Sequence, residues 1–371
     1  MKRIKTITSH DVYNYGASLQ AYALMKYLQE RGCEVQVIDY KPSYANARYN
    51  FWYMDAKYKW GNFFILKFLA CLLLAPKRFY TYERKKAFDS FTLKYLCLTK
   101  KKYFSYDALK EDAELCADVF IVGSDQVWNS NHANGKDPAN YLGFVRGKAK
   151  KMSYAASFGM DHIEKGYELF VKQMLENFEL ITVREKHGVE ILSRLGIVSK
   201  QVVDPVFLLD KEKWNSIAES KTLDEDSILV YDFGNNPLIK VFAQEYARKH
   251  KVKIYSINDF IPHRYADKNI NNAGPEAFLN WIRNAKCFIS NSFHGTAFSI
   301  IYEIPFWVFK RKDCVNSRMD SLLDMVGLEN RVIEDDTSFE RMDEDIDYQS
   351  VKRNLERNIT FSKEILLRSI S

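Results

Sequence analysis

The sequence lacks the cysteine pattern of a disulfide-rich or zinc-binding protein. Its 371 residues include six cysteines, and no two of them form a C-x-x-C pair. Several lie in apolar runs, which favours buried, reduced thiols over disulfide bonds or zinc ligands. His and Cys show no metal-ligand spacing, and the D-x-D patterns at residues 224–226 and 343–347 fall in acidic runs typical of a solvated surface. We therefore expect no metal site.

Long apolar runs are also missing. The first five residues, M-K-R-I-K, lack the apolar core of a signal peptide. The longest apolar run, residues 63–75, is interrupted by Lys67, and it is shorter than the ~20 residues that span a bilayer. We therefore expect a cytoplasmic protein, and its length favours two domains over a single core.

Strand and helix patterns alternate along the sequence, as in α/β proteins. Residues 4–8 and 35–39 have the composition of strands, and the apolar face of residues 17–31 predicts a helix that stops at Gly32. This βαβ opening predicts a parallel sheet with helices on both faces. The first loop lacks G-x-G-x-x-G, so the dinucleotide fingerprint is absent.

The pattern continues into two Rossmann-like domains that face each other across a cleft. We expect the first domain at residues 1–208, the second at 209–345, and a C-terminal helix at 346–371. A basic, aromatic helical insertion is expected in the first domain at about residues 44–106, where thirteen Lys and Arg accompany three Asp and Glu. This insertion is either a lid over the first domain, the more common arrangement, or a contact with an anionic membrane surface or a lipid-linked acceptor.

The most informative stretch is residues 286–305. Residues 287–290 suit a buried strand, residues 291–294 a polar turn, and residues 296–303 a buried helix. A turn of this kind binds anions, because free N–H groups and the positive end of the helix dipole point to the same place. His294 in the turn can donate a hydrogen bond to an anion and move a proton near neutral pH. A histidine that merely caps the helix is an equally plausible interpretation of this stretch alone.

Polar turns follow the other predicted strands and should meet at the cleft, since parallel sheets bind ligands at the carboxyl ends of their strands. Arg184 is a natural clamp for a carboxylate or phosphate, or else the partner of Asp204 or Glu185 in a structural ion pair. Asp125 is either a base or a helix cap. The candidate substrate-binding residues are Asn14, Gly16, Gln20, Ser124, Asp125, Gln126, Ser157, Arg184, Asn291, Ser292, Gly295, Thr296 and Arg318.

Six motifs occur in a specific order: N-Y-G-A-S-L-Q, F-I-V-G-S-D-Q-V-W-N, S-Y-A-A-S-F-G, T-V-R-E-K, V-V-D-P-V-F-L-L and I-S-N-S-F-H-G-T-A-F. Together, over residues 11–320, they resemble the polysaccharide pyruvyl transferase family. The resemblance implies a GT-B-like fold and the transfer of the enolpyruvyl group of phosphoenolpyruvate to two sugar hydroxyls, which forms a ketal. It also implies that His294 is the catalytic histidine and that Arg184 is a ligand of phosphoenolpyruvate.

One departure from the family pattern stands next to the histidine. Many members carry Arg where this chain has Ser292, and Lys310, Arg311 or Arg318 are the candidate replacements. Two other functions stay open: a GT-B glycosyltransferase that uses a nucleotide sugar, and a non-catalytic member that binds glycan.

For the leading function we expect phosphoenolpyruvate as donor and a sugar or lipid-linked glycan as acceptor, in the assembly of a cell-surface polysaccharide. Neither a cofactor nor a nucleic-acid partner is expected. Peripheral contact with the inner face of the membrane is part of the same hypothesis, because it would bring the enzyme close to a lipid-linked acceptor.

Overall fold

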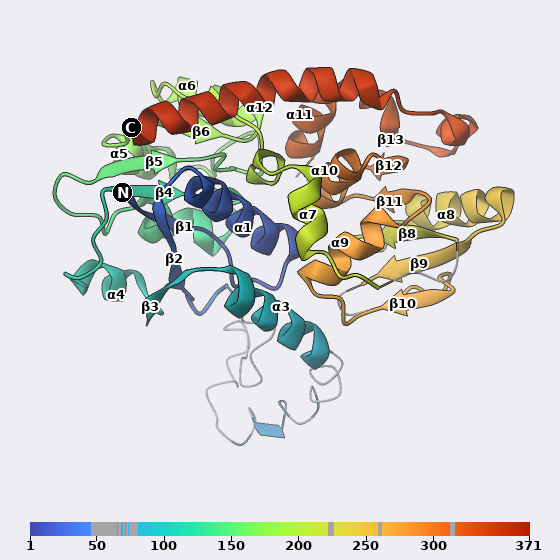
Figure 1. Ribbon diagram of the computed structural model, residues 1–371, viewed down its shortest axis with the longest axis horizontal. Helices are drawn as coiled ribbons and strands as arrows, with labels where there is room; N and C mark the ends of the chain where they lie inside the picture. The colour runs from blue at the N-terminus through green and yellow to red at the C-terminus, as the bar shows by residue number, and fades with distance from the viewer. Residues whose placement is uncertain are drawn as a thin grey trace.

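The computed structural model describes residues 1–45, 65, 68, 69, 71, 73, 81–221, 226–258, 262–311 and 316–371. Two parallel sheets stand side by side, each covered by helices (Figure 1). This arrangement confirms the predicted α/β class with two Rossmann-like domains. Within the described ranges, no helix is long and apolar enough to cross a membrane.

The first sheet has the order β3-β2-β1-β4-β5, and every neighbouring pair is parallel. Its strands are β1 (Arg3–Ile7), β2 (Glu34–Tyr40), β3 (Leu98–Tyr103), β4 (Val119–Val122) and β5 (Lys150–Ser153). A short parallel pair, β6 (Thr182–Val183) and β7 (Lys200–Gln201), continues from this domain. The chain crosses from one side of β1 to the other between β3 and β4, and ligands bind at such a switch point in open α/β sheets.

The second sheet has the order β10-β9-β8-β11-β12-β13 and is also parallel throughout. Its strands are β8 (Ser227–Tyr231), β9 (Lys253–Ile257), β10 (Lys268–Ile270), β11 (Phe288–Ser290), β12 (Phe306–Phe309) and β13 (Val332–Ile333). Strands β8, β11 and β12 are buried along their whole length, which explains their continuous apolar runs.

The helices cover both sheets and join the two domains (Figure 1). They are α1 (Tyr15–Glu30), α3 (Tyr82–Tyr95), α4 (Tyr106–Glu111), α5 (Glu168–Leu175), α6 (Lys186–Arg194), α7 (Lys211–Ile217), α8 (Pro237–His250), α9 (Pro275–Arg283), α10 (Phe293–Tyr302), α11 (Ser317–Val326) and α12 (Tyr348–Ile370). The 3-10 helix η5 (Pro205–Leu208) packs against α1 and α10 between the domains.

The prediction of a helical insertion at residues 44–106 was too wide. Leu98–Tyr103 form strand β3 at the edge of the first sheet, where Thr99 accepts a hydrogen bond from the backbone of Asp39 at 3.0 Å. The edge of β2 offers unpaired backbone groups, and pairing with β3 satisfies them. Helix α3 buries Phe88 and Phe91 in the core. The apolar run at residues 63–75 lies largely outside the described residues.

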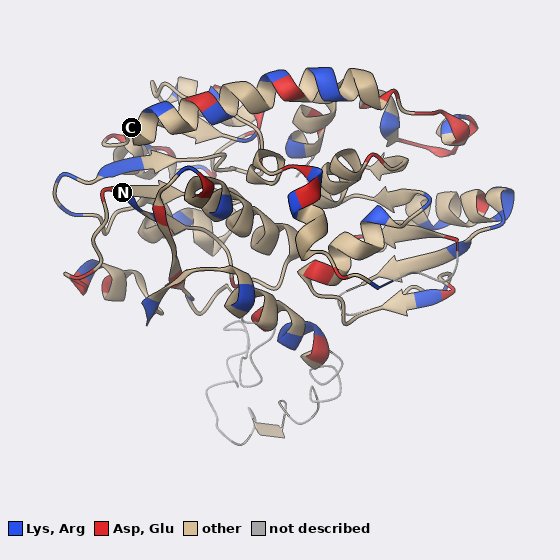
Figure 2. Cartoon of the chain, viewed as in Figure 1, with Lys and Arg blue, Asp and Glu red and all other residues tan. Residues whose placement is uncertain are grey.

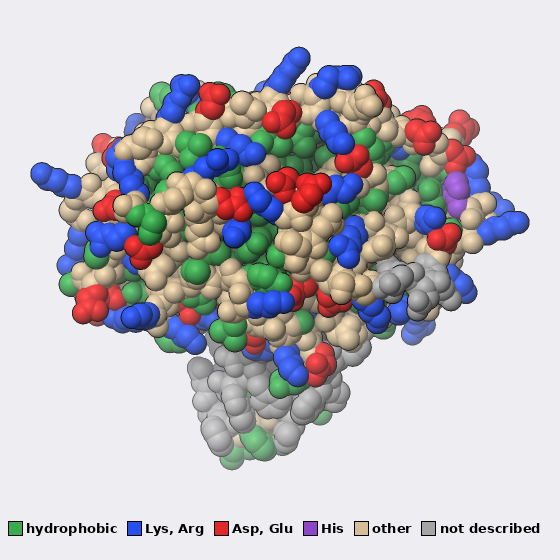
Figure 3. All heavy atoms as spheres, in the orientation of Figure 1, with side chains coloured by type: hydrophobic (Ala, Val, Ile, Leu, Met, Phe, Trp, Pro, Cys, Tyr) green, Lys and Arg blue, Asp and Glu red, His purple; other side chains and the backbone are tan. Residues whose placement is uncertain are grey.

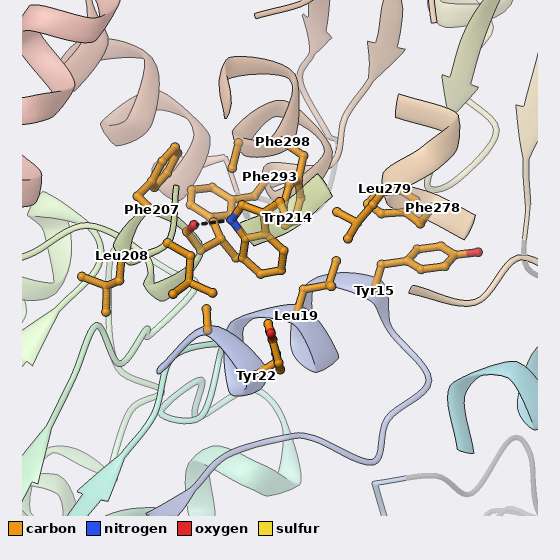
Figure 4. Close-up of a cluster of buried hydrophobic side chains, with 14 of the residues drawn as sticks. Tyr15, Leu19, Tyr22, Phe207, Leu208, Trp214, Phe278, Leu279, Phe293 and Phe298 are labelled. Carbon is orange, nitrogen blue, oxygen red and sulfur yellow. Dashed lines mark hydrogen bonds between the residues drawn. The ribbon is translucent and has the colours of Figure 1, made fainter. Parts of the chain in front are cut away.

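An aromatic seam holds the two domains together (Figure 4). The ring of Tyr15, at the start of α1, stacks on Phe278 of α9 with centroids 4.2 Å apart. Trp214 of α7 meets Tyr22 of α1 and Phe298 of α10 edge to face. These rings belong to one continuous hydrophobic core, in which α1 and α10 also contact each other.

Helix α12 runs from the second domain back over the first (Figure 1), with basic and acidic residues interspersed along it (Figure 2). Ser362 of α12 accepts a hydrogen bond from the backbone of Val203 at 3.0 Å, and Lys2 reaches the carbonyl of Ser371. A groove beside α12 exposes hydrophobic side chains (Figure 3), and its lining includes Phe207 and Ile300. Among the described residues, this groove shares none of the lining of the polar pocket between the domains.

Candidate active site

Helix α10 begins earlier than the sequence predicted. It starts at Phe293 rather than Thr296, because Ser292 acts as its N-cap: the hydroxyl accepts from the Gly295 N–H at 3.3 Å and the carbonyl accepts from the Thr296 N–H at 3.0 Å. His294 therefore lies in the first helical turn and not in the loop before it. Among the described residues, the N–H groups of Phe293 and His294 have no hydrogen-bond acceptor, so they are available to an external acceptor at this helix end.

The imidazole of His294, from the second domain, is held between two residues of the first domain. On one side, it packs against the backbone of Gly16 in the first turn of α1, where a Cβ atom would overlap Nδ1. On the other side, Nε2 lies 3.5 Å from Oδ2 of Asp204, which is within ion-pair range but long for a strong hydrogen bond. The side chain of Asn14 caps α1 through the Ala17 N–H at 3.3 Å. Two positive helix ends thus meet at this ring.

Asp204 is the buried anion of the site, with 1% of its surface exposed. Its Oδ2 accepts from Arg184 Nη1 at 2.7 Å and from the Ser124 hydroxyl at 2.9 Å, and its Oδ1 accepts from the Val206 N–H at 3.1 Å. Burial alone would raise the pKa of Asp204, but the charges of His294 and Arg184 hold that pKa well below its usual range. Asp204 therefore stays ionised beside the imidazole of His294.

The sequence left two roles open for Arg184, a clamp for an anionic ligand and a structural ion pair. In the structure Arg184 forms the ion pair. It is 3% exposed, it pairs with Asp204, and its guanidinium lies over the ring of Phe293 at 4.4 Å. Its Nε and Nη2 have no hydrogen-bond partner among the described residues. Arg184 does not line the pocket that the described residues form around His294.

A polar pocket opens beside His294 between the two domains. Seven of the predicted site residues line it, namely Asn14, Asp125, Gln126, Asn291, Ser292, His294 and Arg318, together with Phe233, Phe293, Phe309, Arg311, Asn316 and Met319. Asp125 has a left-handed backbone with φ of 83°, which is uncommon for a non-glycine residue and typical of a functional turn.

Two arginines bring positive charge to this pocket. Arg318 is 7% exposed, and its burial together with repulsion from Arg184 lowers its pKa to about 10. When the Gln126 amide oxygen faces Arg318, it accepts from Nη2 at 2.8 Å. Arg311 packs over the ring of Phe233 at 5.1 Å. Lys310, the third proposed replacement for the missing arginine, instead pairs with a surface glutamate.

The remaining predicted residues do not line the pocket formed by the described residues, and they hydrogen-bond or pack against the residues around it. Gln20 donates to Thr8 and to the Ala17 carbonyl, both at 2.9 Å. Ser124 binds Asp204, Ser157 donates to a buried glutamate at 3.0 Å, and Thr296 donates to the carbonyl of Ser292 at 3.1 Å. Gly16 and Gly295 are close-approach positions, against His294 and Phe288 respectively. These side chains or backbones hold loops and helix ends in place.

Asp204, Asp232 and Arg311 are charged residues of this region that were absent from the predicted site. Asp204 was considered only as a partner of Arg184, because its approach to His294 joins chain segments 90 positions apart. Asp232 follows β8 directly, the same signal that identified the other turns, so it could have been found. Arg311 was considered only as a replacement cation.

The comparisons with known proteins agree with this architecture. The sequence model of the family described as polysaccharide pyruvyl transferase matches residues 14–313. A comparison with curated protein sequences finds no match.

Two solved structures share the fold at low identity. UDP-N-acetylglucosamine 2-epimerase from Rickettsia bellii has a TM-score of 0.54 and 11% identity, over 99% of this chain and 95% of that one. The S. aureus MnaA–UDP complex has a TM-score of 0.52 and 10% identity, over the same shares of the two chains. Both likenesses show the two-domain, GT-B-like fold that the sequence predicted. The match over residues 14–313 establishes the family: the chain belongs to the polysaccharide pyruvyl transferase family.

Proposed function

We propose that this transferase moves the enolpyruvyl group of phosphoenolpyruvate onto two hydroxyls of a sugar and so forms a ketal. The observation that carries the proposal is the position of His294. This residue lies at the N-terminus of α10, between Gly16 and the buried carboxylate of Asp204. A buried carboxylate beside the imidazole suits a histidine that transfers a proton. The positive helix end and Arg318 suit an anionic donor.

His294 is the acid of the proposed reaction. Its proton goes to the methylene carbon C3 of phosphoenolpyruvate, which becomes a methyl group, and C2 becomes oxocarbenium-like. One sugar hydroxyl oxygen bonds to C2 and gives up its proton, which restores His294. The bond from C2 to the phosphate oxygen then breaks, the second hydroxyl bonds to C2, and its proton leaves with inorganic phosphate.

The positive groups divide between the two ends of the donor in this proposal. Arg318 and the N–H groups of the first turn of α10 bind the phosphate, where charge grows as the bond to C2 breaks. Arg311 binds the carboxylate. Arg184 keeps Asp204 ionised and in place, so its effect on the donor passes through His294. No metal or cofactor takes part in this scheme.

The acceptor is proposed to be a sugar of a cell-surface polysaccharide, either free or lipid-linked. The basic segment at residues 44–106, in which residues 46–64 and 74–80 lie outside the described residues, is the proposed contact with an anionic membrane surface at its cytoplasmic face. Thirteen Lys and Arg against three Asp and Glu in this segment support that proposal.

Thermal stability in the presence of candidate donors tests the function directly. A ligand that binds only the folded state raises the unfolding temperature, so phosphoenolpyruvate should raise it and a set of nucleotide sugars should not. Release of inorganic phosphate with a sugar acceptor then tests turnover. Stabilisation by a nucleotide sugar alone would replace this proposal with a GT-B glycosyltransferase, and binding without turnover of either donor would indicate a glycan-binding member.

A further inference from the structure

The carboxylate of Asp232 joins the ends of two strands beside the active site. Asp232 directly follows β8, and its Oδ1 accepts from the side-chain amide of Asn291 at 3.0 Å. Its Oδ2 accepts from the Asn236 N–H at 2.7 Å and closes the turn that leads into α8. Asn291 in turn accepts from the Phe233 N–H at 2.8 Å. The end of β8 is thereby tied to the end of β11.

This tie is next to the N-cap of the catalytic helix. Asn291 lines the pocket and immediately precedes Ser292, whose side chain and carbonyl begin α10. Both carboxylate oxygens of Asp232 face N–H donors, so an ionised carboxylate accepts from both. A protonated carboxyl or an amide would turn one of its own hydrogens toward a donor and leave a hydrogen bond unmade.

We propose that Asp232 is a positioning residue, which as a carboxylate holds the Asn291 amide and with it the first turn of α10 that carries His294. The kinetic part of this inference rests on the proposed function. Asp232 acts through Asn291 and does not itself line the pocket formed by the described residues.

The partly buried surroundings of Asp232 disfavour its ionised form. Burial raises its pKa to about 6, although the hydrogen bonds from Asn236 and Asn291 and the charge of Arg311 oppose that rise. Tyr265, before β10, is the other titratable group that senses Asp232: burial and then the charge of Asp232 raise the pKa of its hydroxyl. Retention of a partly buried, costly charge is typical of functional sites.

The sign of the resulting pH dependence follows from linkage. An aspartate whose pKa is higher in the folded protein than in the unfolded chain binds more protons when folded. Its contribution to stability is therefore full at low pH and is lost as the pH rises through about 6. Substrate positioning has the opposite dependence, because it needs the ionised form.

The test compares Asp232→Asn with wild type and with the control Asp267→Asn. Asp267 also accepts a backbone N–H, that of Ile254 at 2.8 Å, but in the exposed turn before β10. Phosphate release is measured from pH 5 to 8 at saturating and limiting phosphoenolpyruvate. We expect Asp232→Asn to lower turnover at pH 7.5 by about 100-fold, as for a misplaced catalytic group, and to lose the fall in rate near pH 6. The control should keep the wild-type rate and profile.

Two measurements without substrate separate this inference from the proposed function. Amide hydrogen exchange of residues 291–296 should be faster in Asp232→Asn than in wild type at pH 7.5, and equal to wild type in the control. The unfolding temperature of the variant relative to wild type should rise between pH 5 and pH 7.5. An unchanged exchange rate together with a wild-type pH profile would overturn the positioning role. If wild type itself releases no phosphate, the proposed function fails, and the exchange and stability measurements still decide the role of Asp232.

Discussion

Substitution of Gly16 by alanine probes the contact between the two domains at the catalytic histidine. A Cβ at this position overlaps Nδ1 of His294, so the ring or the first turn of α1 must move by more than ~1 Å to restore van der Waals contact. A displacement of about 1 Å in a catalytic group lowers the rate by about 100-fold, which corresponds to ~2.7 kcal/mol of transition-state stabilisation.

The same substitution should destabilise the fold only while the histidine ring is present. Overpacking of a close contact costs about 1–3 kcal/mol of unfolding free energy, whereas alanine in place of glycine in a helix contributes up to ~1 kcal/mol. In the background of His294→Ala, the overlap with the ring disappears and only the second effect remains. We therefore expect Gly16→Ala to lower the free energy of unfolding in wild type and to leave it unchanged or higher in His294→Ala.

A double-mutant cycle measures this coupling. Urea unfolding of the four proteins gives a coupling energy of about 1–3 kcal/mol if the ring and Gly16 are in contact, and phosphate release gives the loss of turnover in Gly16→Ala. Equal destabilisation by Gly16→Ala in both backgrounds would refute the contact, and a wild-type rate in Gly16→Ala would refute the need for this position of the ring.

Three further outcomes are expected. His294→Gln should abolish phosphate release while the unfolding temperature stays near that of wild type, and near-normal turnover would exclude acid catalysis by this residue. Arg318→Lys should weaken phosphoenolpyruvate binding by ~1–3 kcal/mol in titration calorimetry, because a point charge replaces a planar fork. Arg184 does not line the pocket formed by the described residues, so Arg184→Lys should change donor affinity less. A larger effect of Arg184→Lys than of Arg318→Lys would return Arg184 to the role of direct ligand. The protein should sediment with anionic vesicles at low salt and be released at high salt, and a protein that stays in the supernatant at low salt would leave the segment at residues 44–106 as a lid.

Local chemistry made part of this protein predictable from its sequence. Apolar strands, the polar turns that follow them and the order of the motifs were enough for the α/β class and for the position of His294 at a helix end, since these depend on nearest neighbours in the chain. The prediction was less accurate where a local pattern had two solutions. Leu98–Tyr103 were assigned to a helical insertion but pair with β2, and the helix expected from Thr296 begins at Phe293, because Ser292 caps it.

The arrangement around the histidine was decided by tertiary structure. Gly16 and Asp204 reach His294 from segments far away in the chain, and the aromatic seam between the domains sets their distance. The sequence allowed Arg184 to be either a ligand clamp or an ion-pair partner. Which role it takes depends on whether its guanidinium lies beside the Asp204 carboxylate or in the pocket, and this is a matter of tertiary structure. Packing within the first domain, to which both residues belong, brings that buried carboxylate within 2.7 Å of the guanidinium, and Arg318 of the second domain is the buried arginine that lines the pocket.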